Sequence, residues 1–373
     1  MDFSLTEEQQ AIQELARQIL SDRVTQERLK QVEAGEERAD REVWAELARA
    51  GLLALAVPAE LGGSGLGFLE VCVLLEEVGR TVAPVPALET LVMGALPVAA
   101  FGSQALQAEL LGPVAGGDSF LTAALVEEGG DPRRPATRAT REGEGWRLEG
   151  SKAFVPYGTL AQRVVVSAAT GEGTAGLFVV DPEGPGVRRQ RQETSSGRPE
   201  AELELDGAPV PPAWVLGDPT GRADALEWLL DRVVAGLCVV AVGVCEEALR
   251  LTAEYTKTRE QFDRPIATFQ AVGQRAADAY IDTEAVRLTA WQAAWRLSED
   301  LPAAHEVAMA KYWAADGGQR VVHAAQHLHG GIGVDREYPL HRYFLWAKHI
   351  ELTLGGATPQ LLRLGSLMAS EPA

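Results

Sequence analysis

The chain of 373 residues carries 53 Asp and Glu against 34 Lys and Arg, which gives a formal net charge of −19 at pH 7. Such an acidic chain repels phosphate backbones, so we expect no nucleic-acid partner. Because 46% of the residues are hydrophobic, a chain of this length can bury a large core and divide into two or three domains.

The cysteines and the apolar runs indicate the compartment. Cys72, Cys238 and Cys245 lie in apolar surroundings, which is typical of core thiols in a reducing compartment and not of a disulfide framework. The longest strongly apolar run, residues 233–245, is shorter than the roughly 20 residues that cross a bilayer. The N-terminus is acidic and unlike a signal peptide. We therefore expect a cytoplasmic protein with no membrane partner.

Residues 1–115 are predicted to form an N-terminal helical domain. Thr6 and Gln9 have capping-box spacing before an amphipathic pattern. Further helical patterns cover residues 41–51, where Gly51 suits the C′ position, and residues 68–80. The sequence "GSGLG" at 63–67 lacks the preceding strand of a dinucleotide-binding motif, so we interpret it as a loop.

The pattern of apolar and turn-forming residues changes twice after this domain. Residues 116–215 contain short β-rich runs separated by Gly, Pro and Asp, which predicts a small antiparallel β domain. Helical periodicity returns and dominates residues 216–373. The order helical, β, helical predicts the α+β class and not an alternating α/β fold.

A histidine pair in the C-terminal region has the spacing of a metal site. His323 and His327 are four residues apart, but Ala324 stands where the HExxH motif has its glutamate, and no third ligand suggests itself. We therefore expect no metal.

Two C-terminal stretches gather residues that bind ligands. "TKTREQFDRPIATFQ" contains Arg259, Phe262 and Gln270, which could hold an anionic ligand with an aromatic ring by charge, stacking and amide hydrogen bonds. A solvated helix end is the alternative. "HLHGGIGVDREYPLHRYF" adds glycines for close backbone approach to a polar and aromatic set. "ELTLGGATPQLLRLG", residues 351–365, reads locally as a helix C-cap followed by a turn.

Taken together, these stretches resemble the acyl-CoA dehydrogenase family. The matching segments are "DFSLTEEQQ", "VPAELGGSGLG", "LEGSKAFV", "YTKTREQFDRPIATFQAV", "QHLHGGIGVDREYPLHRYF" and "LGGATPQLLRLG", and they span nearly the whole chain. The resemblance implies an N-terminal helical domain, a central antiparallel β domain and a C-terminal four-helix bundle. This is the order that the periodicity predicts independently.

The resemblance also implies an activity. Family members catalyse FAD-dependent α,β-dehydrogenation of an acyl-CoA thioester, in which a carboxylate removes the α proton and the β hydrogen leaves as hydride to the flavin. It implies an electron-transfer acceptor and a homo- or hetero-oligomer, with FAD between the β domain and the bundle and its adenine end reaching a neighbouring subunit. The chain looks most like members that work as unlike-subunit pairs on bulky, steroid-side-chain or similar thioesters. A base-lacking subunit that contributes FAD binding and structure is the alternative.

The resemblance implies cofactor contacts at matching positions. Arg259 and Phe262 would meet the FAD pyrophosphate and adenine, and Gln270 would hydrogen-bond the cofactor. Five further positions would line its path or hold it: His327, Gly330, Gly331, Thr358 and Gln360. The threonine that relatives place against the flavin corresponds to Pro156, which has no backbone N–H to donate.

The catalytic base has no obvious match. In many members the loop matching "TLGGATPQ" carries it, but here that place holds Leu354 or Gly355. Some relatives carry it near the start of the long bundle helix, where Val233 stands. Asp231, two residues earlier, is the first candidate base and Glu351 the second. Their alternatives are a helix-start carboxylate and a residue on a helix face.

Overall fold

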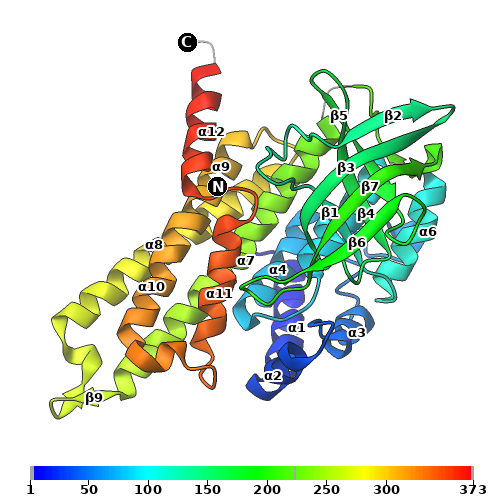
Figure 1. Cartoon of the computed structure of the whole chain (residues 1–373). Coiled ribbons are helices and arrows are strands. Elements are labelled where there is room, and N and C mark those ends of the chain that lie inside the picture. Colours follow the sequence, from blue (N-terminus) through cyan, green and yellow to red (C-terminus); the bar gives the residue numbers. More distant parts are fainter. Residues whose placement is uncertain (1–3, 222–223, 371–373) are drawn as a thin grey trace.

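The structure is a computed structural model that describes residues 4–221 and 224–370. Helices come first along the chain, strands follow, and helices return to the end (Figure 1). The sheet lies on one side of the molecule and the long helices of the C-terminal region on the other (Figure 1). The α+β class and the order of elements expected from periodicity are confirmed.

The N-terminal region contains α1 (Glu7–Arg23), α2 (Gln26–Ala34), α3 (Arg41–Arg49), η1 (Ala59–Leu61), α4 (Phe68–Thr81), η2 (Leu88–Ala95), α5 (Leu96–Phe101) and α6 (Gln104–Ala115). The predicted capping box forms at α1, because the backbone N–H of Gln9 donates to Thr6 Oγ1 and that of Thr6 donates to Gln9 Oε1. Gly51 has φ +77° directly after the C-cap of α3, as its position predicted.

Segment η2 is a π-helix whose eight residues are all buried. Its sequence, LETLVMGA, carries one ionisable side chain, Glu89. π-helical turns are rare and often lie at functional sites, because the wider turn displaces side chains from the ordinary helical path. Glu89 is therefore held inside the molecule on an unusual backbone.

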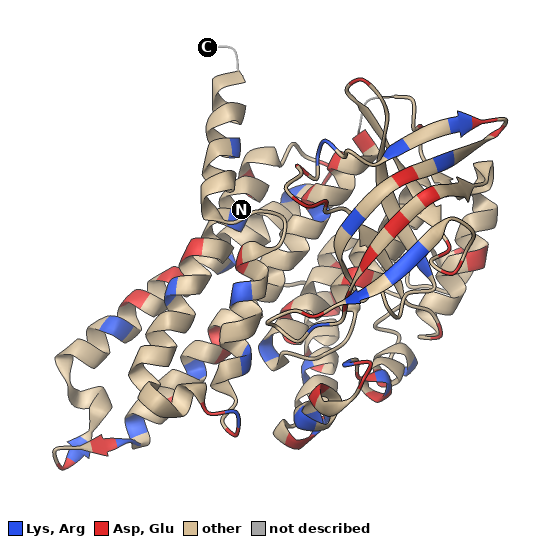
Figure 2. Ribbon diagram, in the orientation of Figure 1, with Lys and Arg blue, Asp and Glu red and all other residues tan. Residues whose placement is uncertain are grey.

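The central region forms one sheet. Within the described residues it has eight strands: β1 (Leu121–Ala124), β2 (Arg138–Glu142), β3 (Gly145–Pro156), β4 (Arg163–Gly171), β5 (Thr174–Val180), β6 (Val187–Gln192), β7 (Glu200–Val210) and β8 (Val215–Leu216). The order is β6-β7-β3-β2-β4-β5-β8, and β1 pairs with β4. The β4 contacts with β1 and β2 are parallel in an otherwise antiparallel sheet. Acidic residues stand at every second position in the first part of β7, and basic residues are frequent in β6 (Figure 2).

An irregularity in β3 turns one aromatic side chain out of the sheet. The pairing of β3 with β7 shifts register between Lys152 and Val155. Phe154, inside this shift, has φ +52°, a left-handed conformation that is uncommon for a non-glycine residue. Its side chain is 52% exposed, and it lines the cavity described below. The bulge thus re-aims a side chain beside a cavity, a common use of such irregularities.

The C-terminal region is a helical bundle with one further helix. It contains α7 (Asp224–Thr258), β9 (Glu260–Gln261), β10 (Arg264–Pro265), η4 (Ile266–Thr268), α8 (Gln270–Ser298), α9 (Ala304–Tyr312), η5 (Trp313–Gly317), α10 (Gly318–His329), η6 (Gly330–Val334), α11 (Leu340–Leu352) and α12 (Ala357–Ser370). Helix α7 packs against α4, α8, α10 and α11. Its close approach to α4 requires glycines, since a Cβ at Gly243 would lie 2.0 Å from Glu76 O and one at Gly79 would lie 2.1 Å from Val240 O.

Helix α7 is longer than its most apolar run suggested. Its 35 residues make it the one helix of residues 4–221 and 224–370 that is long and apolar enough to span a membrane, and 89% of its apolar window is buried inside the protein. The expectation drawn from residues 233–245 alone therefore underestimated the helix. Its burial pattern is that of a core helix.

One core joins the three regions. It includes Leu75 from α4, Val179 from β5, and Leu237 and Val242 from α7, while a second core lies within the sheet. Helix α6 ends at Ala115, and β1 begins at Leu121. The predicted border at 115/116 therefore falls between these two elements. The predicted border at 215/216 falls inside β8, because this two-residue strand still pairs with β5. The cavities lie where the regions meet.

Candidate active site

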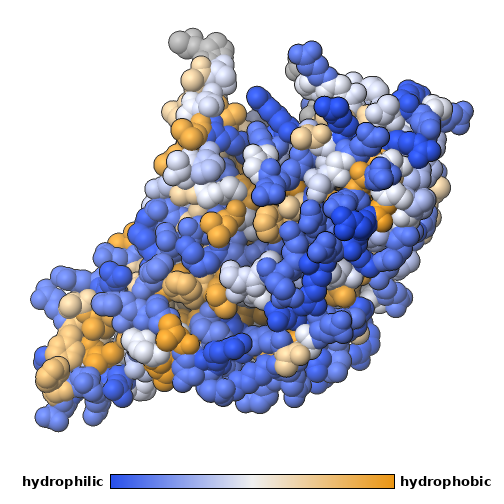
Figure 3. All heavy atoms as spheres, in the orientation of Figure 1, coloured by the Kyte–Doolittle hydropathy of each residue, from blue (hydrophilic) through white to orange (hydrophobic). Residues whose placement is uncertain are grey.

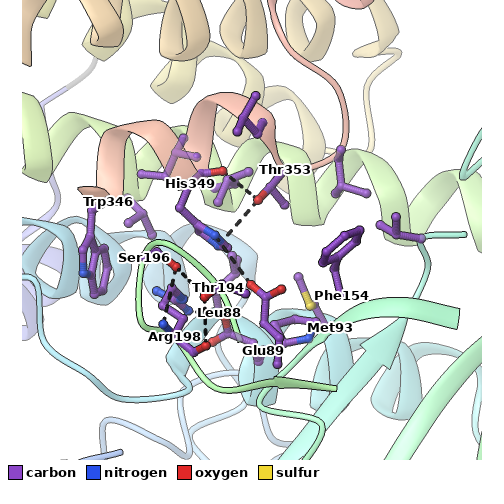
Figure 4. Close-up of a pocket in the computed structure, with 18 of the residues that line it drawn as sticks. Leu88, Glu89, Met93, Phe154, Thr194, Ser196, Arg198, Trp346, His349 and Thr353 are labelled. Atoms are coloured by element: carbon purple, nitrogen blue, oxygen red, sulfur yellow. Dashed lines mark hydrogen bonds and ion pairs between the residues drawn. The ribbon is translucent and has the colours of Figure 1, made fainter. Parts of the chain in front are cut away.

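A cavity of about 430 Å³ lies where α4, η2, β1, β3, α7 and α11 meet (Figure 4). Much of its wall is apolar, including Leu75, Leu88, Met93, Leu237 and Val240. Concave, mostly apolar cavities with a few convergent polar groups are the usual form of small-molecule sites. We refer to it as the central cavity.

A second cavity, of about 560 Å³, lies between α2, η6 and α11. Both cavities are lined by Thr194, Ser195, Ser196, Arg198 and Trp346. The loop before β7 and one indole therefore form the partition between the two. Arg198 belongs to the wall of both.

A buried ion pair crosses one wall of the central cavity. Arg198 Nη2 donates to Glu89 Oε1 across 2.5 Å, and the two side chains are 11% and 3% exposed. The guanidinium lies 5.4 Å from the Tyr157 ring centroid and 4.8 Å from that of Trp346, a cation–π arrangement that fixes its position. Burial raises the pKa of Glu89 although Arg198 opposes the shift.

Glu200 and His349 extend this cluster. Glu200 Oε1 lies 3.6 Å from His349 Nδ1, and both residues line the cavity. Burial, with the charges of Arg198 and Lys311, lowers the pKa of His349 to about 3, so its imidazole is neutral at pH 7. Burial also raises the pKa of Glu200. In Figure 4 the imidazole of His349 points from its helix toward the side of the cavity where Glu89 and Arg198 lie.

The C-terminal turn brings Leu354 to the cavity wall. Helix α11 ends at Leu352, and Leu354 and Gly355 then have φ +55° and +94° before α12 begins. The ammonium of Lys311, fully buried, donates to the carbonyl oxygens of Ile350 and Glu351 across 2.8 and 3.1 Å and so holds the helix end. The local reading of a C-cap followed by a turn is confirmed. Of the two positions that the resemblance links to a catalytic base, Leu354 lines the cavity with an aliphatic side chain and Gly355 has no side chain.

The two candidate bases lie outside the cavity lining. Asp231 Oδ1 accepts hydrogen bonds from Arg133 across 2.9 Å and from Arg363 across 3.2 Å. The carboxylate of Glu351 accepts one from Lys348 across 2.6 Å. Ion pairing explains both carboxylates without a catalytic role. Their assignment as bases stays a prediction that the geometry does not favour.

Three of the predicted cofactor residues lie at the far end of the bundle. Arg259, Phe262 and Gln270 surround the β9–β10 hairpin, at the lower left of Figure 1. Phe262 is 86% exposed and meets Phe269 edge-on, with 6.2 Å between ring centroids. Arg259 is exposed, and its side chain has no ion pair with any residue that the structure describes. Figure 3 shows hydrophobic residues exposed at this end of the molecule.

The glycine motif lies at the same end. His329 stacks on Tyr255 with 4.5 Å between ring centroids, so the end of α10 lies beside the end of α7. The predicted residues His327, Gly330 and Gly331 adjoin this contact in the sequence. Six of the eight predicted cofactor residues therefore gather around one end of the bundle.

The other two lie on α12. Gln360 is buried and donates to Leu354 O across 3.2 Å, whereas Thr358 is exposed. Arg363, on the same helix, contacts Asp231, and Asp231 precedes Arg259 by 28 residues. At ~1.5 Å per helical residue, this places the α12 contact about 42 Å from the hairpin end along α7. The predicted cofactor residues on α12 and those around the hairpin therefore lie apart along α7.

Two separate groups of residues in this chain therefore each suit one part of FAD. Gln360 Oε1 is buried without a hydrogen-bond partner among the described residues, and Phe154 offers an aromatic face at the central cavity. The hairpin end offers an exposed aromatic ring and an arginine that suit a purine and a diphosphate. Each part has suitable chemistry, and the two parts lie apart in this chain.

Sequence reasoning missed the charged cluster of the central cavity. Glu89, the neighbouring pair Arg198 and Glu200, and His349 come from three separate segments and form no local motif. One signal was present: Glu89 is the single charge in the apolar stretch "LETLVMGALPV". A lone carboxylate in such a run predicts a buried partner.

Three family models match the chain. They are the acyl-CoA dehydrogenase N-terminal domain over residues 6–118, the middle domain over 125–207 and the C-terminal domain over 224–365. The three matches follow the helical, β and helical regions of the structure.

Similar proteins are known in sequence and in structure. "Acyl-CoA dehydrogenase FadE27" of Mycobacterium tuberculosis is 43% identical over the full length of both chains. A solved variant of the Tcur3481-Tcur3483 steroid ACAD has 49% identity and a TM-score of 0.92, covering 97% of this chain and 98% of that one. A chain of the ChsE4-ChsE5 complex of Mycobacterium tuberculosis has 44% identity and a TM-score of 0.95, with both chains covered completely.

Proposed function

The chain belongs to the acyl-CoA dehydrogenase family, and we propose that it works as one subunit of an oligomeric assembly that needs a second chain to complete each FAD site. The family reaction is FAD-dependent α,β-dehydrogenation of an acyl-CoA thioester, an oxidoreduction of a CH–CH group. The observation that carries the proposal is the separation of Arg259 and Phe262 from the central cavity. Solved relatives described as two-component assemblies support an unlike partner.

The cavity wall and the hairpin would hold different parts of the cofactor in this arrangement. The wall formed by Val126, Phe154 and Pro156 would hold the flavin ring, and the hairpin with Arg259 and Phe262 would hold the diphosphate and adenine of a cofactor seated in the neighbouring chain. When bound, FAD supplies the hydride acceptor. The protein excludes water from the cavity and orients the thioester against the flavin wall.

A second candidate function rests on Leu354. The side chain at this position lines the cavity and cannot take a proton, and neither Asp231 nor Glu351 lines the cavity. The chain would then be a base-lacking subunit that contributes structure and FAD contacts, while its partner carries the base. Both functions require the oligomer. They differ in whether the cavity of this chain itself catalyses the reaction.

The relatives support a substrate class, and the cysteines support a compartment. The resemblance to a steroid ACAD favours a bulky acyl-CoA thioester, and an electron-transfer protein would reoxidise the flavin. We place the protein in the cytoplasm, in keeping with its reduced cysteines.

The test is the visible absorption spectrum of the chain purified alone and after mixing with an unlike, base-bearing family member, followed by size-exclusion chromatography. We expect flavin absorbance to rise to a stoichiometric level only in the mixed assembly. A monomer that retains stoichiometric FAD would refute the need for a second chain. Turnover of the mixed assembly before and after inactivation of the partner's base then separates an active subunit from a base-lacking one.

A further inference from the structure

Two residues that line the central cavity each have a buried polar atom without a partner among the described residues. Within the part of the chain that the structure describes, Glu89 Oε2 and Arg198 Nε are buried and make no hydrogen bond. Another polar atom of each of these side chains, Glu89 Oε1 and Arg198 Nη2, forms the ion pair described above. The pair therefore keeps one acceptor and one donor unused, and leaving such buried groups unpaired is unfavourable.

The position of the pair is fixed on both sides. Tyr157 and Trp346 hold the guanidinium through their ring faces, and the π-helix η2 holds Glu89 within the core. Both residues line the central cavity, whose surrounding wall includes Leu75, Leu88 and other apolar side chains. A rigid donor and acceptor in an apolar wall can discriminate between ligands, because their desolvation is offset only by a matching polar group.

The charges of the cluster indicate what kind of group matches. Glu89 and Arg198 compensate each other, and a neutral His349 adds no charge. A ligand carboxylate would meet Glu89 and Glu200, and a ligand ammonium would meet Arg198. A neutral group avoids both repulsions, and it satisfies both free atoms if it donates and accepts one hydrogen bond each.

We propose that Glu89 and Arg198 form a recognition site for a neutral hydroxyl or secondary amide of the bound thioester. This inference rests on the proposed function, since it assumes that the central cavity takes an acyl-CoA. The hydroxyl would lie on the acyl group, and the amide would lie in the pantetheine arm. Glu89 accepts the hydrogen of either group, and Arg198 donates to its oxygen.

Unreactive thioether analogues test the site by calorimetry. The probes are a length series of S-alkyl-CoA compounds and the matching series with one chain hydroxyl, measured on the FAD-loaded assembly. Each is compared in the wild type, in the double variant Glu89→Leu with Arg198→Leu, and in Met93→Leu, an apolar control in the same wall. Replacing both members of the pair leaves neither Glu89 nor Arg198 buried without the other, and urea denaturation checks that the variant is folded.

An acyl hydroxyl at the site predicts that one hydroxylated probe binds the wild type about tenfold more tightly than its alkyl match. The double variant then loses or reverses that preference, while Met93→Leu keeps it. A pantetheine amide at the site predicts that the double variant weakens both series, and free CoA, about tenfold.

Two results would overturn the inference. Equal affinities in all three proteins for both series would mean that water satisfies Glu89 Oε2 and Arg198 Nε. Absence of binding by any probe to the wild-type assembly would refute the proposed function itself, and the inference with it.

Discussion

Arg363 of α12 donates a hydrogen bond to Asp231 of α7 across 3.2 Å, and Arg133 donates to the same oxygen across 2.9 Å. The carboxylate is 15% exposed. It therefore joins the last helix and the loop before β2 to the start of the central helix. This contact gives Asp231 a structural role that its sequence position did not indicate.

Asp231→Asn is accordingly expected to lower stability and to leave chemistry intact. The amide weakens two charged hydrogen bonds, which corresponds to a loss of about 1–3 kcal/mol in the free energy of unfolding. Glu227→Gln is the matched control, because Glu227 also contacts Arg133 but is 43% exposed. Urea denaturation measures the stability, and turnover per folded molecule measures the chemistry. Loss of turnover at unchanged stability would instead assign Asp231 as the base.

Leu354→Glu is expected to create a base in a cavity that lacks one at this position. The side chain lines the cavity, and the backbone there already has φ +55°, so the substitution retains the existing conformation. An apolar wall raises the pKa of a carboxyl, which suits proton abstraction near neutral pH. If the chain is base-lacking, flavin reduction by acyl-CoA should accelerate ~10²-fold or more. Leu354→Gln is the control, and equal rates in the two variants would contradict the prediction.

Phe262→Ala is expected to affect cofactor retention and not folding. The ring is 86% exposed, so its removal should change the unfolding free energy of the isolated chain by less than about 0.5 kcal/mol. In the assembly, loss of an adenine-stacking face should lower FAD occupancy. Fluorescence of released FAD after dilution measures this effect. Phe262→Tyr keeps the aromatic face and should behave as wild type; full occupancy in the alanine variant would exclude a stacking role.

Lys152→Met is expected to be strongly destabilising. Lys152 is fully buried, and its Nζ donates to Glu127 across 2.7 Å and to Ser167 across 3.1 Å. Removing the ammonium leaves the Glu127 carboxylate without its cation, at a cost of about 3–5 kcal/mol. Adding Glu127→Gln should recover part of the loss. Lys257→Met, at a side chain 64% exposed, is the control, and similar melting temperatures for the two lysine variants would refute this account.

His349 is expected to make the fold sensitive to acid. Its folded pKa is about 3, against an ordinary value of 6.5, so between these values the unfolded chain binds the proton more readily. Its contribution to stability is therefore retained above pH 6.5 and declines as the pH falls towards 3. His349→Gln should flatten the fall in melting temperature between pH 7 and pH 5. His327→Gln, at an exposed histidine, should not. Parallel curves for wild type and His349→Gln would contradict the burial argument.

The order of the elements could be predicted from the sequence because it depends on local residue patterns. The Thr6 capping box, Gly51 after α3 and the turn at Gly355 all depend on neighbours within a few residues. The family motifs likewise drew attention to the residues around the hairpin and the cavity turn, whose role in holding FAD stays a prediction. Such signals can be recognised without knowledge of the rest of the chain.

The tertiary structure alone decided which of these residues share a site. Glu89 pairs with Arg198 across 109 positions of sequence, and Asp231 pairs with Arg363 across 132. The sequence by itself determined the class, the family resemblance and the residue types, since periodicity and motifs are local. Long-range packing then decided that Asp231 pairs with Arg133 and Arg363, that Leu354 lines the cavity and that the predicted cofactor residues form two separated groups, because the direction of a side chain depends on the elements packed around it.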